Sequence, residues 1–354
     1  MTVLLTGATG LIGANLARLL AADGLRPRLL VRSRSNRRGL RGVDYHEVQG
    51  DILDVNSLRR AMDGVTQVYH LAGSVRFDPF SASGTRRVHV DGTRNVVLAA
   101  KAAGVRKLVH VSGAAAIGYG PLSEPATEAT RYNFPGGNPY QETKREAEAI
   151  ALGASCEGFE VVATNPSFTV GAYDSRPSSG QILLMVARGV ARFYPSGGTN
   201  YVNAMDVARG CLLAMAKGRP GERYILGGEN LTHRQFLTLC ASEVGVRPPL
   251  FPIPEGLAAR LGRVGDRVGG LAPDLFKNIN SSTVASMFLP AYYSSQKAMR
   301  ELGYRPGPVI DGVREAYRWF QEEGMVPRDR PLTPRRVATP PSASCSSASR
   351  RRAG

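Results

Sequence analysis

Residues 2–13, TVLLTGATGLIG, join a short apolar run to three regularly spaced glycines. The apolar run predicts a strand, and the residues that follow it predict a helix. Between the two, Gly7 permits a tight turn, Gly10 lets the backbone approach a pyrophosphate, and Gly13 lets the helix pack closely on the strand. The first turn of such a helix presents free N–H groups and the positive end of the helix dipole. This stretch therefore predicts a dinucleotide-binding site at the start of the chain.

Strand-like and helix-like stretches alternate beyond this motif. The strand-like runs are TVLL, RLLV, DYHEV, QVYHLA, KLVHVS, FEVVAT and ERYIL, and the amphipathic stretches cover residues 11–22, 54–62, 85–103 and 140–152. Repeated alternation of this kind predicts a parallel sheet with helices on both faces. We therefore expect an α/β protein with a Rossmann-type, doubly wound sheet.

The alternation loosens after about Pro166. Helical periodicity there covers residues 179–188, 206–216, 232–244, 255–268, 294–302 and 309–323, with Thr232, Ser294 and Gly303 as capping residues. We expect three regions: an NAD(P)-binding core at residues 1–165, the remaining core elements and a small, mostly helical substrate lobe at 166–326, and a tail at 327–354. The tail is basic, rich in proline and serine and without apolar periodicity, which predicts disorder.

The composition limits the class of protein. With 43% hydrophobic and 21% charged residues, the chain is not disordered throughout. It has no apolar run long enough to span a bilayer and no room for a signal peptide before the first strand, so we expect a cytoplasmic protein without an integral membrane segment. The four cysteines and five histidines lack ligand spacing, so we expect neither disulfides nor a metal site.

The net charge of +16 comes mainly from two segments. Residues 26–42 carry seven arginines and no acidic residue, and residues 327–354 carry seven arginines and one aspartate. Only six of the 45 basic residues are lysine, which is typical of a compositional bias rather than of selection for phosphate contact. We therefore expect a small-molecule substrate and no nucleic-acid partner.

The residues after the second strand bear on which dinucleotide binds. An NAD-preferring site has an acidic residue there, which accepts a hydrogen bond from the ribose 2′-hydroxyl. No acidic residue occurs between Asp23 and Asp44. The strand runs instead into Arg32, with Arg37 close behind, and guanidinium groups suit a 2′-phosphate. We therefore expect NADP, with NAD as the alternative.

Tyr140 and Lys144, in PYQETK, are four residues apart, so on a helix their side chains project from one face. A lysine ammonium favours the phenolate and so lowers the pKa of the tyrosine, which makes it an acid or base near neutral pH. Such a pair can move a proton at a carbinol oxygen while a nicotinamide moves hydride. Tyr293 and Lys297 share the spacing. Because the first pair follows the fifth strand of the alternating half, we assign catalysis to it and a core or surface role to the second.

With the glycine loop and this pair, the chain resembles the extended short-chain dehydrogenase/reductase family, the NAD-dependent epimerase/dehydratase group, over about residues 1–325. The segments VRSRSNRRGLRG, VDGTRNV, GRPGERYILGGENLT and YYSSQKAMRELGYRP are most similar to hopanoid-associated sugar epimerases, and next most similar to dihydroflavonol reductase-like enzymes. The resemblance implies a nicotinamide cofactor and carbonyl/carbinol chemistry. It also implies that Asn165, Pro166 and Ser167 lie beside nicotinamide and substrate, and that the helices at 85–103 and 140–152 could pair in a homodimer.

Two positions depart from the family's pattern. Its members usually carry a Ser or Thr five residues before a glycine after the fifth strand, and counting back from Gly118 gives Gly113. Ser112 is one residue early, and because adjacent strand residues point opposite ways, its access to the reacting oxygen stays open. His89 stands where relatives usually have Asn, a residue that often braces a water near the lysine.

We therefore expect an NAD(P)-dependent enzyme of the sugar epimerase/dehydratase type, acting at a carbonyl/carbinol centre of a sugar-nucleotide-like or similar small substrate. Tyr140 is the expected general acid/base, Lys144 lowers its pKa and contacts the ribose, and Ser112 is the candidate polariser of the reacting oxygen. Two alternatives stay open. One is an NADPH-dependent ketone reductase, which the arginines favour, and the other is a non-catalytic dinucleotide-binding sensor or scaffold, which Gly113 and His89 favour.

The cofactor contacts follow from the loop and the carboxyl ends of the strands. Asp51, after the third strand, is a candidate acceptor for the adenine amino group, and HLAG at residues 70–73 passes near the centre of the cofactor. The expected cofactor-binding residues are Gly7, Thr9, Gly10, Leu11, Ile12, Gly13, Arg32, Arg37, Asp51, Ile52, Leu71, Ala72, Gly73, Tyr140, Lys144, Pro166 and Ser167.

Overall fold

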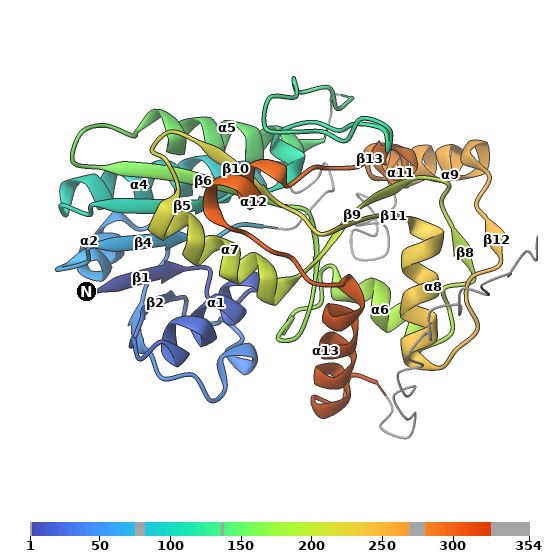
Figure 1. Ribbon diagram of the computed structural model, residues 1–354, viewed down its shortest axis with the longest axis horizontal. Coiled ribbons are helices and arrows are strands. Elements are labelled where there is room, and N and C mark those ends of the chain that lie inside the picture. Colours follow the sequence, from blue (N-terminus) through green and yellow to red (C-terminus); the bar gives the residue numbers. More distant parts are fainter. Residues whose placement is uncertain (1, 75–81, 136–137, 269–279, 327–354) are drawn as a thin grey trace, which may run out of the picture.

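The computed structural model describes residues 2–74, 82–135, 138–268 and 280–326. A parallel seven-stranded sheet runs through the larger part of the molecule in the order β10-β6-β5-β4-β1-β2-β3 (Figure 1). Its strands are β1 Val3–Thr6, β2 Arg28–Val31, β3 His46–Gln49, β4 Gln67–His70, β5 Lys107–Val111, β6 Glu160–Pro166 and β10 Arg223–Leu226. These are the seven runs that the sequence indicates, so the predicted Rossmann-type fold is confirmed. The strand order reverses between β1 and β4, which is where such sheets bind their ligands.

Helices cover both faces of this sheet. On one face α1 Leu11–Ala22 packs against α7 Ala204–Lys217, and on the other α4 Gly92–Ala102 packs against α2 Val55–Met62 and α5 Pro139–Gly153. Successive residues of one strand serve the two faces: Leu4 and Leu5, for example, belong to separate buried clusters. This is why the strands read as continuous apolar runs rather than alternating ones.

The helix expected at residues 85–103 is not a single regular helix. A short α3, Ala82–Arg86, leads into a π-helical turn at Arg87–Asp91, and α4 follows. A π-turn widens the backbone ring by one residue and is frequently found at functional sites. Here its central residue, His89, is buried against α5.

The rest of the second half forms a smaller lobe. It contains α6 Gly180–Ala187, α8 His233–Val244 and α13 Val309–Glu322, which pack around a core that includes Tyr201, Phe236 and Phe320. It also contains a second sheet, in which β9 Gly198–Asn203 pairs with β7 Phe168–Val170, β11 Glu229–Thr232 and β13 Pro290–Ala291. The sequence does not indicate this sheet, because its strands are short and show no alternation.

Two further pairs of elements complete the lobe. The two-residue strands β8 Phe193–Tyr194 and β12 Phe251–Pro252 pair with each other, and α9 Glu255–Val268 packs against α11 Ser281–Phe288, which the sequence does not indicate.

Two of the three predicted helix caps are confirmed. Thr232 caps α8 in a capping box with Gln235, and Gly303 ends α12, Gln296–Leu302, with a φ of 76°. The N-cap position of α12 is Ser295 rather than Ser294, although the Ser294 hydroxyl still accepts a long hydrogen bond of 3.4 Å from the N–H of Gln296, the first residue of the helix. The predicted disorder of residues 327–354 concerns residues outside those described. In the part that is described, no helix is long and apolar enough to cross a membrane.

Candidate active site

The glycine loop between β1 and α1 is as tight as the sequence predicts. Gly7 has a φ of +72°, and a Cβ there would lie 2.5 Å from the backbone nitrogen of Ala72 on the neighbouring strand end. A Cβ at Gly13 would lie 2.4 Å from the carbonyl oxygen of Gly7. Gly10 precedes α1, whose first turn has neither a side-chain cap nor an acidic residue. The N–H groups of this turn thus face outward without a competing anion, and they fit a pyrophosphate.

The end of β4 lies between this loop and the tyrosine–lysine pair. Leu71 donates its N–H to the carbonyl oxygen of Thr6, so the two strand ends run together past the switch point. A Cβ at Gly73 would lie 3.5 Å from Nζ of Lys144. The structure therefore brings the expected loop, the expected 71–73 segment and Lys144 to one edge of the sheet. Pro166 ends β6 at the same edge, and Ser167, which follows it, donates its hydroxyl to Oδ1 of Asn200.

The arginines after β2 differ in how they are engaged. Arg37 forms an ion pair with Glu47 of β3, at 2.6 Å. Arg38 and Arg41 both pair with Glu323. Arg32 is exposed, and within the described residues its side chain has no ion pair or hydrogen bond. Of the two arginines expected to bind cofactor, Arg32 is therefore the uncompensated cation.

Asp51 and Ile52 follow β3. Oδ1 of Asp51 accepts a hydrogen bond from the N–H of Leu53 at 3.0 Å, which leaves its second carboxylate oxygen for another donor. Ile52 is buried under α4, against Gly92. The Asp51 carboxylate can therefore contact a ligand directly, whereas the buried Ile52 side chain packs against α4.

Local sequence explains where the tyrosine–lysine pair lies. Asn138 caps α5 by accepting from the N–H groups of Tyr140 and Gln141, and Pro139 fits the first helical position. This places Tyr140 in the first turn and Lys144 one turn later. The Nζ of Lys144 is buried and donates a long hydrogen bond of 3.4 Å to the carbonyl oxygen of Val111, at the end of β5.

Burial dominates the titration of both members of the pair. It lowers the pKa of Lys144 to about 8, although the Glu148 carboxylate one turn further along α5 acts in the opposite direction. Burial also raises the pKa of Tyr140 to about 12. The predicted lowering of the Tyr140 pKa by Lys144 is therefore wrong for this structure, because burial, which removes hydration from the phenolate, raises this pKa.

The position that faces the phenol is Gly113. A Cβ at Gly113 would lie 3.8 Å from Oη of Tyr140. Ser112 is buried, and its hydroxyl has no hydrogen-bond partner among the described residues. Asn165 donates an N–H to the carbonyl oxygen of Gly113 at 3.1 Å and another to the Glu148 carboxylate. The backbone at Gly113 is thus fixed opposite Tyr140. The hydroxyl that a Ser or Thr would supply at this position is absent.

His89 ties the π-turn to the first turn of α5. Its Nε2 accepts from the N–H of Ser74 at 3.0 Å, so Nδ1 carries the proton and donates to the hydroxyl of Thr143 at 2.9 Å. Thr143 in turn donates to the carbonyl oxygen of Pro139. Burial lowers the pKa of His89 to about 3, so the ring is neutral. Its edge contacts the ring of Tyr140, with centroids 5.6 Å apart, and so positions the phenol.

Further residues of this site were not predicted from the sequence. Glu148 is buried between Asn165 and Arg223, whose Nη1 lies 3.2 Å from Oε1 of Glu148. Its signal was its spacing, since it follows Lys144 by four residues on the same helix. His70 and His110 occupy paired positions near the ends of β4 and β5, with ring centroids 5.3 Å apart, and burial lowers the pKa of both. In the described chain, no group of three potential ligands is arranged to hold a metal ion.

Comparison with known proteins gives a family and several relatives. Residues 3–227 match the model of the family described as NAD dependent epimerase/dehydratase. The chain is 34% identical over 328 residues to "Sterol demethylase protein B" of Methylococcus capsulatus, which covers 92% of this chain and 100% of that protein. It is 32% identical over 330 residues to "Putative dihydroflavonol 4-reductase" of Synechocystis, with coverage of 91% and 95%. A solved nucleoside-diphosphate-sugar epimerase of Pseudomonas aeruginosa superposes with a TM-score of 0.76 at 25% identity, over 92% of this chain and 99% of that one.

Proposed function

The chain belongs to the NAD-dependent epimerase/dehydratase family, and we propose that Tyr140 exchanges a proton with the reacting oxygen of its substrate. The protein is an NAD(P)-dependent enzyme that acts at a carbonyl or carbinol centre. The observation that carries the assignment to Tyr140 is its position. Its phenol lies opposite Gly113, and Lys144, one turn further along α5, lies beside Gly73 at the carboxyl edge of the parallel sheet.

The residues at this edge would have separate roles in binding the cofactor. A bound nicotinamide dinucleotide would supply or accept the hydride. The loop from Gly7 to Gly13 and the first turn of α1 would hold its pyrophosphate. Lys144 would bind the ribose, because its ammonium has donors beyond its long bond to Val111.

Tyr140 handles the proton. With a pKa of about 12, the phenol is protonated at neutral pH and can donate to a carbonyl oxygen as that oxygen gains charge. The phenolate that remains is stabilised by the ammonium of Lys144, which stays mostly protonated below about pH 8. The reverse reaction, oxidation of a carbinol, returns the proton to Tyr140. His89 holds the ring in place throughout.

For the substrate, we propose a sugar-nucleotide-like or similar small molecule held by the smaller lobe within residues 166–326. A second candidate, reduction of a free ketone, is supported by the name of the Synechocystis relative and by uncompensated Arg32, since NADPH serves as an exchangeable reductant. Whether the purified protein retains a bound dinucleotide distinguishes the epimerase from the ketone reductase. An epimerase must keep its dinucleotide through each cycle, whereas a reductase must exchange it.

We also propose a homodimer formed through α4 and α5.

Turnover tests the function itself. Purified enzyme would be mixed with reduced dinucleotide and a panel of ketones, and with NAD(P)+ and a panel of nucleoside-diphosphate sugars. We expect nicotinamide oxidation in the first series or epimerisation in the second, and its loss in Tyr140→Phe. Turnover that survives in Tyr140→Phe would contradict the role given to this residue.

The preference for NADP is a separate proposal, and calorimetric titration tests it. We expect NADP(H) to bind more tightly than NAD(H), and Arg32→Asp to reverse the order, because the new carboxylate would repel the 2′-phosphate and accept from the ribose hydroxyl. Arg60→Asp, on the exposed side of α2, is the matched control and should leave the order unchanged. Equal affinities in the wild-type protein, or tighter NAD, would contradict the proposal.

A further inference from the structure

Helix α9 exposes an apolar face to solvent. Leu257, Leu261 and Val264 are 53%, 53% and 47% exposed. Their spacing of four and three residues puts them on one face of the helix. Small residues of α9 form its contact with α11: a Cβ at Gly262 would lie 3.0 Å from Cα of Ser281 on α11. The larger apolar side chains of α9 therefore point away from the protein's own core.

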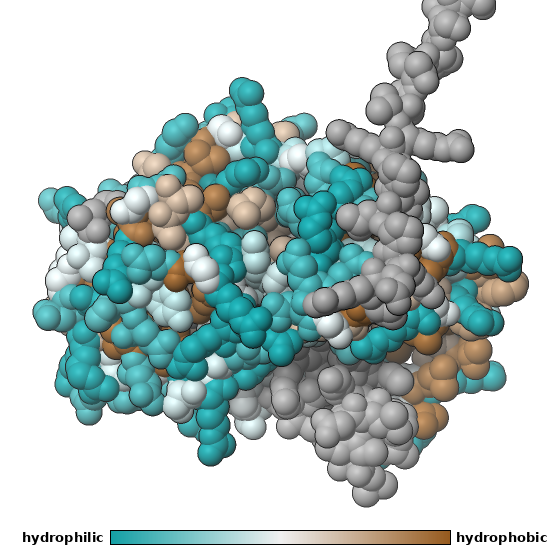
Figure 2. Space-filling view, turned by 90° about the horizontal axis from the view of Figure 1, so that it is seen from below, coloured by the Kyte–Doolittle hydropathy of each residue, from teal (hydrophilic) through white to brown (hydrophobic). Residues whose placement is uncertain are grey.

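The exposed apolar surface continues into the strands that precede α9. Phe193 of β8 and Phe251 of β12 are paired in register, with ring centroids 6.0 Å apart, and both are 57% exposed. Leu250 beside them is 63% exposed. Figure 2 shows hydrophobic surface gathered at the right-hand end of the molecule, where Figure 1 places β8, β12 and α9. We call this surface the α9 face. It consists of Phe193, Leu250, Phe251, Leu257, Leu261 and Val264.

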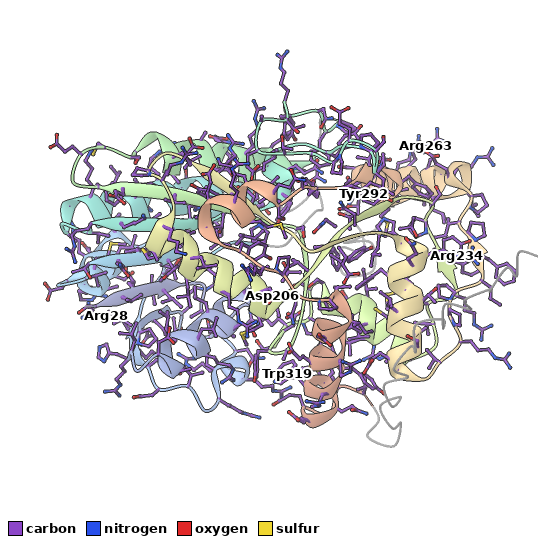
Figure 3. The ribbon with its side chains drawn as sticks, viewed as in Figure 1. Arg28, Asp206, Arg234, Arg263, Tyr292 and Trp319 are labelled. Carbon is purple, nitrogen blue, oxygen red and sulfur yellow. The ribbon has the colours of Figure 1, made fainter. Side chains whose placement is uncertain are left out.

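Arginines surround this surface. On α9, Arg260, Arg263 and Arg267 follow a line next to the apolar one, as their spacing of three and four residues requires. The neighbouring elements add further exposed arginines: Arg188, Arg192, Arg234 and Arg247. Figure 3 shows two of these side chains, Arg234 on α8 and Arg263 on α9, at this end of the molecule. Within the described residues, none of these arginines forms an ion pair.

Acidic side chains are few here. Within residues 180–200 and 232–268, the exposed acidic residues are Glu255 and Asp266, and Asp266 already accepts from the N–H of Ser281. Glu243 is buried and paired with Arg314. The surface therefore combines exposed aliphatic and aromatic side chains with an excess of positive charge.

We propose that the α9 face docks on the surface of a membrane that contains anionic lipid. An amphipathic helix with leucine and valine on one face and arginine beside it lies in the plane of an interface, with its apolar side chains at the boundary of headgroups and acyl chains. Arginines flanking such a face extend to the phosphates. Both halves of that arrangement are present on α9. The assignment does not depend on the catalytic role of Tyr140.

A second copy of the chain fits this surface less well. In a symmetric dimer each copy presents the same patch, so the arginine lines of two α9 faces would lie against each other. Unpaired like charges held together in this way oppose association. An anionic lipid layer instead supplies many phosphates to the same arginines.

Vesicle co-sedimentation tests the proposal with the full chain. The probes are vesicles of phosphatidylcholine alone and of phosphatidylcholine mixed with phosphatidylglycerol. We expect binding to the mixed vesicles, weaker binding at high salt, and little binding to phosphatidylcholine alone. Two variants each should weaken binding about tenfold or more: Leu257→Ser with Leu261→Ser and Val264→Ser, and Arg260→Gln with Arg263→Gln and Arg267→Gln. All six positions are exposed, so both variants should keep the wild-type melting temperature.

Two controls locate the binding. Leu122→Ser with Met299→Ser removes two comparably exposed apolar side chains elsewhere and should leave binding unchanged. Arg350→Gln with Arg351→Gln and Arg352→Gln removes charge from the basic C-terminal segment and should also leave it largely unchanged. Absence of vesicle binding, or loss of binding in the second control rather than in the α9 variants, would overturn the proposal. Concentration-dependent dimers in sedimentation velocity that the α9 variants disrupt would also overturn it, since the face would then be a self-interface.

Discussion

Tyr140 and Lys144 share their spacing with Tyr293 and Lys297, yet the two pairs have different surroundings. The Nζ of Lys297 is fully engaged, at 2.6 Å from the carboxylate of Glu222 and 2.9 Å from the carbonyl oxygen of Arg223. Tyr293 is packed in a small buried cluster with Ile117 and Ile225, and the side-chain amide of Asn230 on β11 hydrogen-bonds both its backbone N–H and its carbonyl oxygen. The second pair therefore serves as a structural link between α12 and the edge of the central sheet.

In the first pair, the lysine is engaged less tightly. Among the described residues, Lys144 Nζ has one long hydrogen bond, and its ammonium is available to a ligand. The phenol of Tyr140 faces Gly113, a residue without a side chain. The same spacing thus yields an ion-paired lysine in one place, and in the other a lysine whose ammonium keeps donors for a ligand. The difference comes from position relative to the carboxyl ends of the parallel strands, where such folds bind ligands.

The largest expected effect separates the two tyrosines. Tyr140→Phe should lower turnover by about 100- to 10,000-fold, because it removes the general acid, while cofactor affinity stays largely intact. Tyr293→Phe should leave turnover within about twofold, since the Tyr293 side chain is packed in a buried apolar cluster and takes no part in the proton transfer assigned to Tyr140. Steady-state kinetics and dinucleotide titration of both variants provide the comparison. Similar losses of turnover in the two variants would contradict the assignment of catalysis to the first pair.

The next effect concerns the residue opposite Tyr140. Gly113→Ser should raise turnover by about tenfold or more, because it supplies a hydrogen-bond donor to the reacting oxygen. The substitution fits, since a Cβ there lies at ordinary contact distance from the phenol and the φ of 171° suits any residue. Ser112→Ala should change turnover little. If Ser112→Ala instead costs 100-fold and Gly113→Ser is harmful, then Ser112 is the group that polarises the substrate.

A smaller effect distinguishes the carboxylates beside the two lysines. Turnover should fall as pH rises through about 8, because Lys144 then loses its proton. Glu148→Gln removes a negative charge that favours the ammonium, so the falling limb should move to lower pH by about one unit or less. Glu222→Gln acts on Lys297 and should leave the limb in place. Coincident pH profiles of the two variants would contradict the role of Lys144, and melting temperatures would report any general loss of stability.

Much of the fold was predictable because its signals are local. Except for the edge strand β3, each strand of the central sheet lies in a short, largely apolar run, and the glycine loop has one geometric solution between a strand and a helix. The second sheet was not predictable in this way. Its strands are as short as two residues, as in β13, and they are stabilised by pairing with β9, which is distant in sequence. The helix α11 has no buried side chain and therefore no apolar periodicity that could indicate it.

The site was predictable only in part for a related reason. The spacing of Tyr140 and Lys144 is visible in the sequence, but the direction of the Tyr140 pKa is not, because it depends on burial. The position of Glu148 between Asn165 and Arg223 joins three elements that are adjacent only in the folded sheet. The π-turn that brings His89 to Thr143 likewise has no sequence signature.

The most direct test of the central claim, that the first pair and the glycine loop form one cofactor site, is calorimetric titration of NADP+ and NAD+ into Lys144→Met and Lys297→Met. It requires no knowledge of the substrate. We expect the wild-type protein to bind dinucleotide, Lys144→Met to weaken that binding about tenfold or more through loss of a charge-assisted hydrogen bond, and Lys297→Met to leave it unchanged. A wild-type protein that binds neither dinucleotide, or two variants that weaken binding equally, would contradict the account.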